Sequence, residues 1–281
     1  MIITKLVGGL GNQMFQYACG YSVAKKNNTN LSLDTSWYIE KNSVVWTMAY
    51  ELDRLNISYK NIRNKYPLVN SSNHFMKGFR KHYLTYIEKS IIFDDSIFSA
   101  GSNIVLDGYW QSEKYFIDFK TELQNEYTPV DQIENDYLKQ INDALSVSLH
   151  VRRGDYANHK QTNNFHGLMS LEYYKSAISL MQSRLGDRIT IFIFSDDIEW
   201  CKQNIKTTAN TIYVTGNDGL TDMQLMAACQ NNIIANSSFS WWGAWLNRNP
   251  NKIVVAPDKW FNDPKPNTKD IIPRSWEKIK R

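Results

Sequence analysis

Positions 150 to 156, His-Val-Arg-Arg-Gly-Asp-Tyr, combine a histidine, two arginines and a carboxylate. They overlap a strand-like run from 146 to 151, and ligands collect at the carboxyl ends of strands in open α/β sheets. Alternate side chains of a strand face opposite sides, so His150 and Arg152 share a face from which Arg153 points away. A guanidinium can bind a phosphate through two hydrogen bonds. We predict that Arg152 binds phosphate and that Arg153 pairs with an acid; the alternative is a purely structural group of salt bridges.

Two adjacent carboxylates, Asp196 and Asp197, follow a second strand-like run. They could hold a metal, serve as acid and base, or accept hydrogen bonds from the N–H groups of a nucleotide base. Capping of the next helix is the alternative without a ligand. The sequence contains no Asp-x-Asp, and its five histidines lack the spacing of zinc ligands. We therefore predict a site without a metal.

A third group, Asn236 to Trp245, passes from a strand end into a helix start and contains Ser237, Ser238 and Ser240. Hydroxyls and free backbone N–H groups at the positive end of a helix can bind phosphate oxygens without a metal. Alternatively, the serines only cap the helix. We favour the ligand for the serines and burial in the core for the tryptophans.

The glycine-rich loop Gly8 to Gln13 lies between a strand and a helix. Its glycines would let a ligand approach the backbone closely, and a tight turn without a ligand is the alternative. Gly9-x-Gly11 also begins a dinucleotide fingerprint, and Asp34 stands where a ribose-binding acid belongs. Met14 occupies the third glycine position, which disfavours nicotinamide or flavin binding.

Alternating strands and helices must position these groups. The strand-like runs are 1–7, 30–33, 104–106, 146–151, 189–194, 211–214, 233–235 and 253–256; the helix-like runs are 13–26, 132–144, 171–185, 198–204, 223–229 and a short one through Trp245. Asp131 with Glu134, and Thr221 with Gln224, are spaced as helix-start pairs. Positions 51–90 are polar and irregular, which favours loops and short helices.

This order predicts an α/β protein with largely parallel sheets. We place a domain boundary near residue 143, with an N-terminal α/β domain at 1–143 and a doubly wound, Rossmann-like domain at 144–260. Residues 261–281 form a C-terminal tail, and a cleft is expected between the two domains.

Composition excludes several classes of protein. The 281 residues are 42% hydrophobic and 21% charged, which rules out a disordered chain, a collagen and a disulfide scaffold. No apolar run is long enough to span a membrane, and the first residues do not resemble a signal peptide. The cysteines form no paired framework, which indicates a reducing compartment. We expect a cytoplasmic protein.

Charge is uneven along the chain. From residue 54 to residue 93 there are eight Lys or Arg against one acid, and the C-terminal run 273–281 is basic and contains Trp276. Such a basic patch can face an anionic ligand, or make peripheral contact with an anionic membrane through an interfacial tryptophan; an ordinary solvated face is the alternative that we favour. The sequence has no motif of an RNA-recognition sheet or a helix-turn-helix, so we expect no nucleic-acid partner.

The motifs at 8–18, 150–156, 195–197 and 236–245 resemble those of the bacterial α-1,2-fucosyltransferases, glycosyltransferase family 11. The run Gly108-Tyr109-Trp110-Gln111-Ser112-Glu113-Lys114-Tyr115-Phe116 resembles that family too. The resemblance implies a GT-B-like fold with two Rossmann-like domains facing a central cleft, in which the N-terminal domain is on the acceptor side and the C-terminal domain binds GDP-fucose. It also implies a GDP-β-L-fucose donor, an inverted α-1,2 linkage to a galactoside, and no cofactor or divalent metal.

Carried over to this sequence, the resemblance also implies roles for the residues of the motifs. Arg152 would hold the diphosphate, Asp196 or Asp197 would accept hydrogen bonds from guanine, and His150 would lie near the ribose or phosphate. The serines Ser237, Ser238 and Ser240 would bind phosphate oxygens, and the Gly11-Asn12-Gln13 loop would close over the sugar.

Inversion also needs a base for the acceptor hydroxyl. Asp155 is our first candidate for this base, and His159 and His166 are the next. Asp155 could equally be a structural partner of Arg153. The expected acceptor is a galactose-terminated oligosaccharide of O-antigen, capsule or another surface glycan, for which a lipid-linked form is natural. The competing hypotheses are a glycosyltransferase with another donor or linkage, and a nucleotide-binding protein without catalysis.

Overall fold

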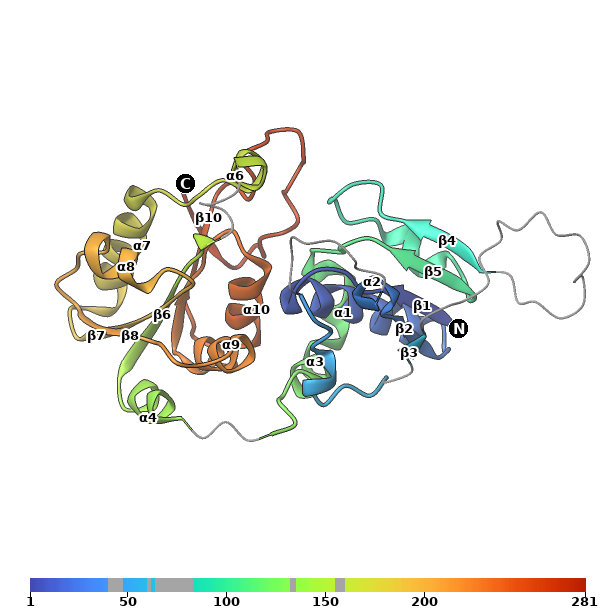
Figure 1. Cartoon of the computed structure of the whole chain (residues 1–281), viewed down its shortest axis with the longest axis horizontal. Helices are drawn as coiled ribbons and strands as arrows, with labels where there is room; N and C mark the ends of the chain where they lie inside the picture. Colours follow the sequence, from blue (N-terminus) through green and yellow to red (C-terminus); the bar gives the residue numbers. More distant parts are fainter. Residues whose placement is uncertain (40–47, 60–61, 64–82, 132–134, 155–159) are drawn as a thin grey trace, which may run out of the picture. The chain divides into compact units, whose positions relative to one another are not determined.

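The computed structural model describes residues 1–39, 48–59, 62–63, 83–131, 135–154 and 160–281. The chain divides into two compact units, Met1–Val130 and Asp131–Arg281, each built on a parallel sheet (Figure 1). The α/β class with two parallel-sheet units is therefore as predicted. The division falls after Val130 instead of near residue 143, because the helix Asp136–Asn142 packs on elements of the second unit.

The first unit contains a five-stranded sheet in the order β3-β2-β1-β5-β4, with every neighbouring pair parallel. Its elements are β1 (Ile2–Lys5), α1 (Leu10–Lys26), β2 (Leu31–Asp34), α2 (Ser36–Ile39), β3 (Ile62–Arg63), β4 (Leu84–Ile87), β5 (Ile104–Asp107) and α3 (Lys120–Glu126), with 3₁₀ turns at Leu52–Arg54, Asp95–Ser99, Glu113–Tyr115 and Ile117–Phe119. The chain leaves β1 toward β2 and β3 on one side and later fills the other side with β5. The strand order therefore reverses between β1 and β5.

Helix α1 begins at Leu10, three residues before the predicted start, because the glycine turn leads directly into it. Gly20 brings the helix onto β1: a Cβ at this position would lie 2.1 Å from the Oγ1 atom of Thr4. Close packing of helix on strand thus depends on a glycine that the dinucleotide fingerprint does not include. Met14, which stands at the fingerprint's third glycine position, is fully buried.

Strand β4 corrects the prediction of an irregular segment at 51–90. It is an edge strand whose side chains are mostly exposed, including Leu84 at 72% and Ile87 at 61%. A strand that is exposed on both faces lacks the alternation of apolar and polar residues that marks a half-buried strand. Most of the predicted basic patch at 54–93 lies outside the described residues.

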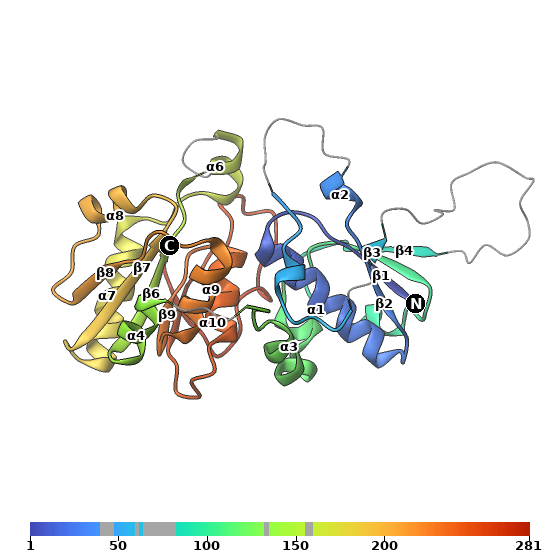
Figure 2. The ribbon, with the colours of Figure 1, turned by 60° about the horizontal axis from the view of Figure 1, so that its bottom comes forward.

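The second unit contains a six-stranded parallel sheet in the order β11-β10-β9-β6-β7-β8. Its elements are α4 (Asp136–Asn142), β6 (Leu145–Val151), α6 (Lys160–His166), α7 (Leu171–Leu185), β7 (Ile189–Ser195), α8 (Ile198–Asn204), β8 (Asn210–Tyr213), α9 (Gly219–Ala228), β9 (Asn231–Ile233), α10 (Ser238–Leu246), β10 (Val254–Pro257) and β11 (Glu277–Ile279). Helices α7 and α8 cover one face and α9 and α10 the other (Figure 2). The strand order reverses between β6 and β9.

Two helix starts in this unit differ from the predicted ones. Asn135 caps α4 by accepting a hydrogen bond from the backbone N–H of Tyr137, and Asp218 caps α9 through the N–H of Thr221. The pairs Asp131 with Glu134 and Thr221 with Gln224 have the spacing of a capping box, but the capping hydrogen bonds are made by Asn135 and Asp218, which are also good cap residues.

Residues 261–281 are an integral part of the second unit, which corrects their assignment as a tail. Strand β11 extends the sheet beside β10, and Ile271, Ile272 and Trp276 are buried. The ring of Trp276 lies 5.4 Å from that of Trp241, so it serves the core and is not an interfacial tryptophan. Within the described ranges, no helix is long and apolar enough to cross a membrane.

Candidate active site

The predicted arginine and aspartate motifs meet at one edge of the second sheet. Val151 and Ser195 are register partners in the parallel pair of β6 and β7, so the residues that follow them leave the sheet side by side. Strand β9 ends at the same edge on the other side of β6 and leads to α10. This edge includes the point where the strand order reverses, which is where doubly wound sheets bind their ligands.

Asp196 holds Arg152 in a defined position. One carboxylate oxygen of Asp196, Oδ2, lies 2.9 Å from Nη1 of Arg152, and the other accepts the backbone N–H of Arg153 at 2.8 Å. Both side chains are partly accessible, at 33% for Arg152 and 25% for Asp196. A Cβ on Gly154 would lie 2.7 Å from Oδ2 of Asp196, so glycine gives the carboxylate the room for this contact. The pair is accessible enough to exchange its partners for those of a ligand.

Arg153 has a structural role, as the alternation of the strand predicted. Its Nε lies 3.2 Å from Oδ2 of Asp197, and its guanidinium covers the ring of Trp200 at 3.9 Å. Asp197 in turn caps α8 by accepting the backbone N–H of Trp200 at 3.1 Å. The capping alternative therefore describes Asp197, and both of its oxygens already have partners.

His150 is buried beside this group. It is 5% exposed, its ring centre lies 5.6 Å from that of Phe239, and its Nδ1 atom has no hydrogen-bond partner among the described residues. Burial lowers the pKa of His150 to about 4; the charge of Asp196 opposes this shift and that of Arg152 adds to it. The imidazole is therefore neutral near pH 7.

The pKa of His150 predicts a loss of stability in acid. The unfolded chain binds this proton below about pH 6.5, and the folded chain only below about pH 4. The unfolded state therefore binds more protons between these values, so the free energy of unfolding falls as the pH is lowered through this window. The loss should be on the order of a few kcal/mol. Urea unfolding at pH 4 to 7 would show a steeper pH dependence for the wild type than for His150→Gln; identical slopes would contradict the prediction.

The three serines have different surroundings. Ser237 is the N-cap of α10 but makes no side-chain capping bond, and Ser238 is half-buried. Ser240 is fully buried, and its hydroxyl donates weakly to the carbonyls of Ala235 and Ser237 at 3.5 and 3.3 Å. Because two residues correspond to about 200° around a helix, Ser240 faces away from the side of Ser238. We correct the predicted phosphate set by removing Ser240.

Asn236 is a residue of this edge whose role the sequence analysis missed. Its side-chain Nδ2 donates to the carbonyls of His166, Gly167 and Trp260 at 2.9, 3.3 and 3.0 Å. It thereby fixes the chain beside the start of α10. An amide that joins three distant carbonyls leaves no local pattern in the sequence. The tryptophans of α10 are buried as predicted.

In the first unit, the glycine loop lies at the matching edge, beside β1. Gly8 has a φ of +81°, a conformation that favours glycine. Gln13 is fully buried: its Nε2 donates to the carbonyls of Gly8 and Ala49, and its Oε1 accepts the N–H of Glu51. Gln13 is thus a clamp that shapes the loop, which corrects its predicted place against the sugar. Gly11 is buried as well, and only Asn12 is partly accessible.

The other predicted groups have mixed outcomes. Asp34 is 6% exposed and accepts the N–H of Ser36 at 3.0 Å, so it serves the turn into α2. The base candidates Asp155 and His159 lie outside the described residues. His166 ends α6, and its ring packs against those of Phe165 and Phe261. In the part of the chain that the structure describes, no three His, Cys, Asp or Glu side chains are grouped as metal ligands.

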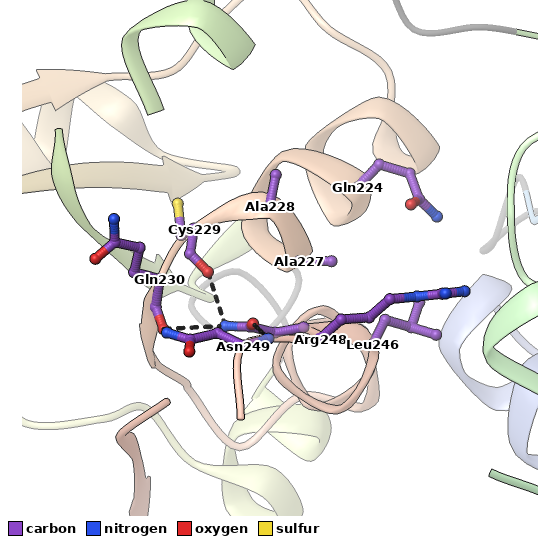
Figure 3. A pocket seen from close by; sticks show the side chains of 9 residues that line it. Gln224, Ala227, Ala228, Cys229, Gln230, Leu246, Arg248 and Asn249 are labelled. Carbon is purple, nitrogen blue, oxygen red and sulfur yellow. Dashed lines mark hydrogen bonds between the residues drawn. The ribbon is translucent and has the colours of Figure 1, made fainter. Parts of the chain in front are cut away.

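A cavity of about 370 Å³ lies elsewhere in the second unit, at the ends of α9 and α10 (Figure 3). Its lining consists of Gln224, Ala227–Gln230 and Leu246–Asn249. These residues precede β9 and β10, so the cavity is at the amino edge of the sheet, opposite Arg152 and Asp196. Doubly wound sheets bind ligands at the carboxyl edge, so we do not assign it to catalysis.

The sequence matches a family model and is similar to several named glycosyltransferases. The model of the family "Glycosyl transferase family 11" matches residues 1–280. An α-1,2-colitosyltransferase of Escherichia coli is 36% identical over 100% of this chain and 99% of its own length. The O-antigen biosynthesis glycosyltransferase WbnK of Escherichia coli is 33% identical over 91% and 93%. Galactoside α-(1,2)-fucosyltransferase 2 of Hylobates lar is 25% identical over 85% and 67%.

Two solved structures are similar in a more distant way. A mutant of FUT1 from Arabidopsis thaliana in complex with GDP has a TM-score of 0.49 at 12% identity, over 91% of this chain and 70% of that one. The fucosyltransferase NodZ from Bradyrhizobium has a TM-score of 0.45 at 13% identity, over 86% and 91%.

Proposed function

The chain belongs to glycosyl transferase family 11, and we propose that it transfers L-fucose from GDP-β-L-fucose to the 2-hydroxyl of a galactoside, with inversion to an α-1,2 linkage. The observation that carries the proposal is the Arg152–Asp196 pair at the reversal of strand order in the second sheet. At this edge of the sheet, the guanidinium of Arg152 can bind a diphosphate and the carboxylate of Asp196 can bind the guanine base. Relatives named as α-1,2-colitosyl- and α-(1,2)-fucosyltransferases support the linkage.

In the proposed reaction, the bond between the anomeric carbon and GDP breaks as the acceptor oxygen attacks. The sugar gains oxocarbenium character and negative charge grows on the β-phosphate. Arg152 stabilises that charge, together with the N–H groups at the start of α10 near Ser237 and Ser238. No divalent metal is required, because these groups supply the positive charge that a metal would bring.

For guanine we choose Asp196 over Asp197. The two oxygens of Asp197 bind the N–H of Trp200 and the side chain of Arg153, while the Oδ2 oxygen of Asp196 binds, among the described residues, only Arg152. When the diphosphate attracts Arg152, that oxygen becomes free to accept the N–H groups of the base. We still propose that His150 lies near the ribose or phosphate. Asp155 is still the proposed general base for the acceptor hydroxyl, and His159 and His166 are the next candidates.

A related donor is the second candidate. The relative at 36% identity is named a colitosyltransferase, and colitose is fucose without its 3-hydroxyl. The relative named for O-antigen biosynthesis supports a surface glycan as the acceptor. It also supports the proposal that the transfer takes place in the cytoplasm. Transfer from GDP-fucose and from GDP-colitose, compared at equal concentration, decides between the donors.

The primary test is release of GDP from GDP-fucose in the presence of EDTA, with and without lactose or a Galβ1,3-linked disaccharide. We expect release that depends on the acceptor, and NMR of the product should show α-linked fucose on O2 of galactose. Release that stops with EDTA and returns with Mg²⁺ would contradict the metal-independent mechanism. GDP binding without turnover would overturn the chosen acceptors, and no binding of GDP would overturn the donor site.

A further inference from the structure

A loop held by several hydrogen bonds follows β5 at the edge where the first sheet reverses its strand order. It spans residues 108–112 and is tied to α1 by two hydrogen bonds. Gln111 Nε2 donates to Oδ1 of Asn12 at 2.9 Å, and Gln16 Nε2 donates to the carbonyl of Gly108 at 3.3 Å. The loop therefore sits at the kind of position where α/β sheets bind ligands.

Glu88, directly after β4, holds the same loop from the other side. Its carboxylate accepts the backbone N–H of Tyr109 at 2.7 Å and that of Trp110 at 3.1 Å. A Cβ on Gly108 would lie 2.4 Å from the Cβ of Glu88, so only glycine allows this approach. Two charge-assisted hydrogen bonds from adjacent amides fix the orientation of the backbone at Tyr109.

The loop keeps a costly conformation. Trp110 has a φ of +56°, and its indole N–H is buried without a hydrogen-bond partner among the described residues. Its ring is buried and packs edge-on against Tyr115, with centres 5.6 Å apart. Backbone strain of this kind persists where the surroundings enforce it, and it concentrates at functional sites. This backbone conformation leaves Trp110 buried and the neighbouring Tyr109 49% exposed.

Another aromatic side chain, Tyr38, binds the glycine loop, and two more rings lie beside it. The Tyr38 hydroxyl donates to the carbonyl of Gly8 at 2.8 Å, and its ring lies 4.9 Å from Trp37 and 6.4 Å from Tyr50. Burial raises the pKa of Tyr38, and the charges of Glu51, Tyr50 and Tyr109 raise it further. An aromatic surface with polar groups at its rim suits a pyranose, whose C–H face is apolar and whose hydroxyls need hydrogen-bond partners.

We propose that Tyr109 is the platform on which the acceptor sugar stacks, and that Glu88 is the positioning residue that fixes it. This inference rests on the proposed function for the nature of the acceptor. The charges of this edge support a neutral ligand: Asp34, Glu88 and Asp107 lie here, and Lys5 is paired with Asp107 at 2.5 Å. A nucleotide diphosphate would meet these carboxylates with like charge, whereas a galactoside would not.

The test separates binding of the acceptor from binding of the donor. Tyr109→Ala should raise the acceptor KM about tenfold or more, because the stacking surface is lost, while the Kd for GDP stays unchanged. Tyr109→Phe and Tyr109→Trp should keep the acceptor KM near that of the wild type. Phe98→Ala is the control, since Phe98 packs on Lys26 at the other end of α1. An unchanged acceptor KM in Tyr109→Ala, or an equal loss of GDP affinity, would overturn the proposal.

Glu88→Gln tests the positioning role. Glutamine offers one acceptor oxygen for two N–H groups, so the acceptor KM should rise while kcat and the Kd for GDP change little. A melting temperature that falls with no change in KM would show that Glu88 is only structural.

Failure of the proposed function would be recognised separately. If the wild type transfers no fucose to any galactoside, saturation-transfer NMR with methyl β-galactoside tests the platform directly. Signal in the wild type that is lost in Tyr109→Ala and kept in Tyr109→Phe supports the platform, and no signal in the wild type overturns it.

Discussion

Arg152→Ala is expected to lower kcat/KM for fucose transfer about a thousandfold while the chain stays folded. The guanidinium is the strongest positive group that we place at the leaving β-phosphate, and its contribution grows as the bond to the sugar breaks. Its side chain is one-third exposed and its ion pair with Asp196 is near the surface, so its removal should cost little stability. Acceptor-dependent GDP release gives the rate, and circular dichroism shows the fold.

Two further variants make this test specific. Arg152→Lys keeps a charge but loses the planar fork, so its activity should lie between those of the wild type and the alanine variant. Arg184→Ala is the matched control, because Arg184 also forms an ion pair, with Glu277 at 3.1 Å, but on the exposed side of α7 and β11. A folded Arg152→Ala enzyme with near-normal activity would remove Arg152 from the mechanism.

The elements that could be predicted are those whose local pattern agrees with their burial. Helices α7 and α8 have the predicted bounds, and β6 and β7 differ from theirs by one residue, because one apolar face of each helix covers strands that are buried along almost their whole length. Strand β4 was not predicted, since its stability comes from pairing with β5 and its side chains stay exposed. Strand β11 is short and polar, and likewise exists through its partner β10.

The site shows the same division. Strand ends and parallel pairing were enough to bring Arg152 together with Asp196, because the carboxyl ends of neighbouring parallel strands meet. These two features do not predict which polar side chains make hydrogen bonds within the protein and are therefore not available to a ligand. Gln13 makes hydrogen bonds to three backbone groups, Asp197 caps a helix, and the hydroxyl of Ser240 bonds to a carbonyl at the start of its own helix. These choices depend on distant carbonyls and amides that a local motif does not contain.

The Arg152–Asp196 pair therefore links the two ends of the proposed nucleotide. In this conformation Arg152 and Asp196 neutralise each other, and a nucleotide must replace that contact with two others, phosphate to Arg152 and base to Asp196. If so, an asparagine at position 196 has opposite effects on the two parts of the ligand. It weakens recognition of guanine, and it releases Arg152 from a competing carboxylate.

Asp196→Asn is accordingly expected to raise the Kd for GDP by about 10- to 100-fold, since it loses a hydrogen bond to a charged acceptor. The Kd for inorganic pyrophosphate should stay the same or fall, because Arg152 no longer has to leave a carboxylate. Calorimetry with both ligands measures the two effects, and Asp187→Asn, a change at an exposed turn before β7 and so at the opposite edge of the sheet, is the control. If Asp196 only positioned Arg152, both affinities would fall together. That parallel loss would remove guanine recognition from Asp196.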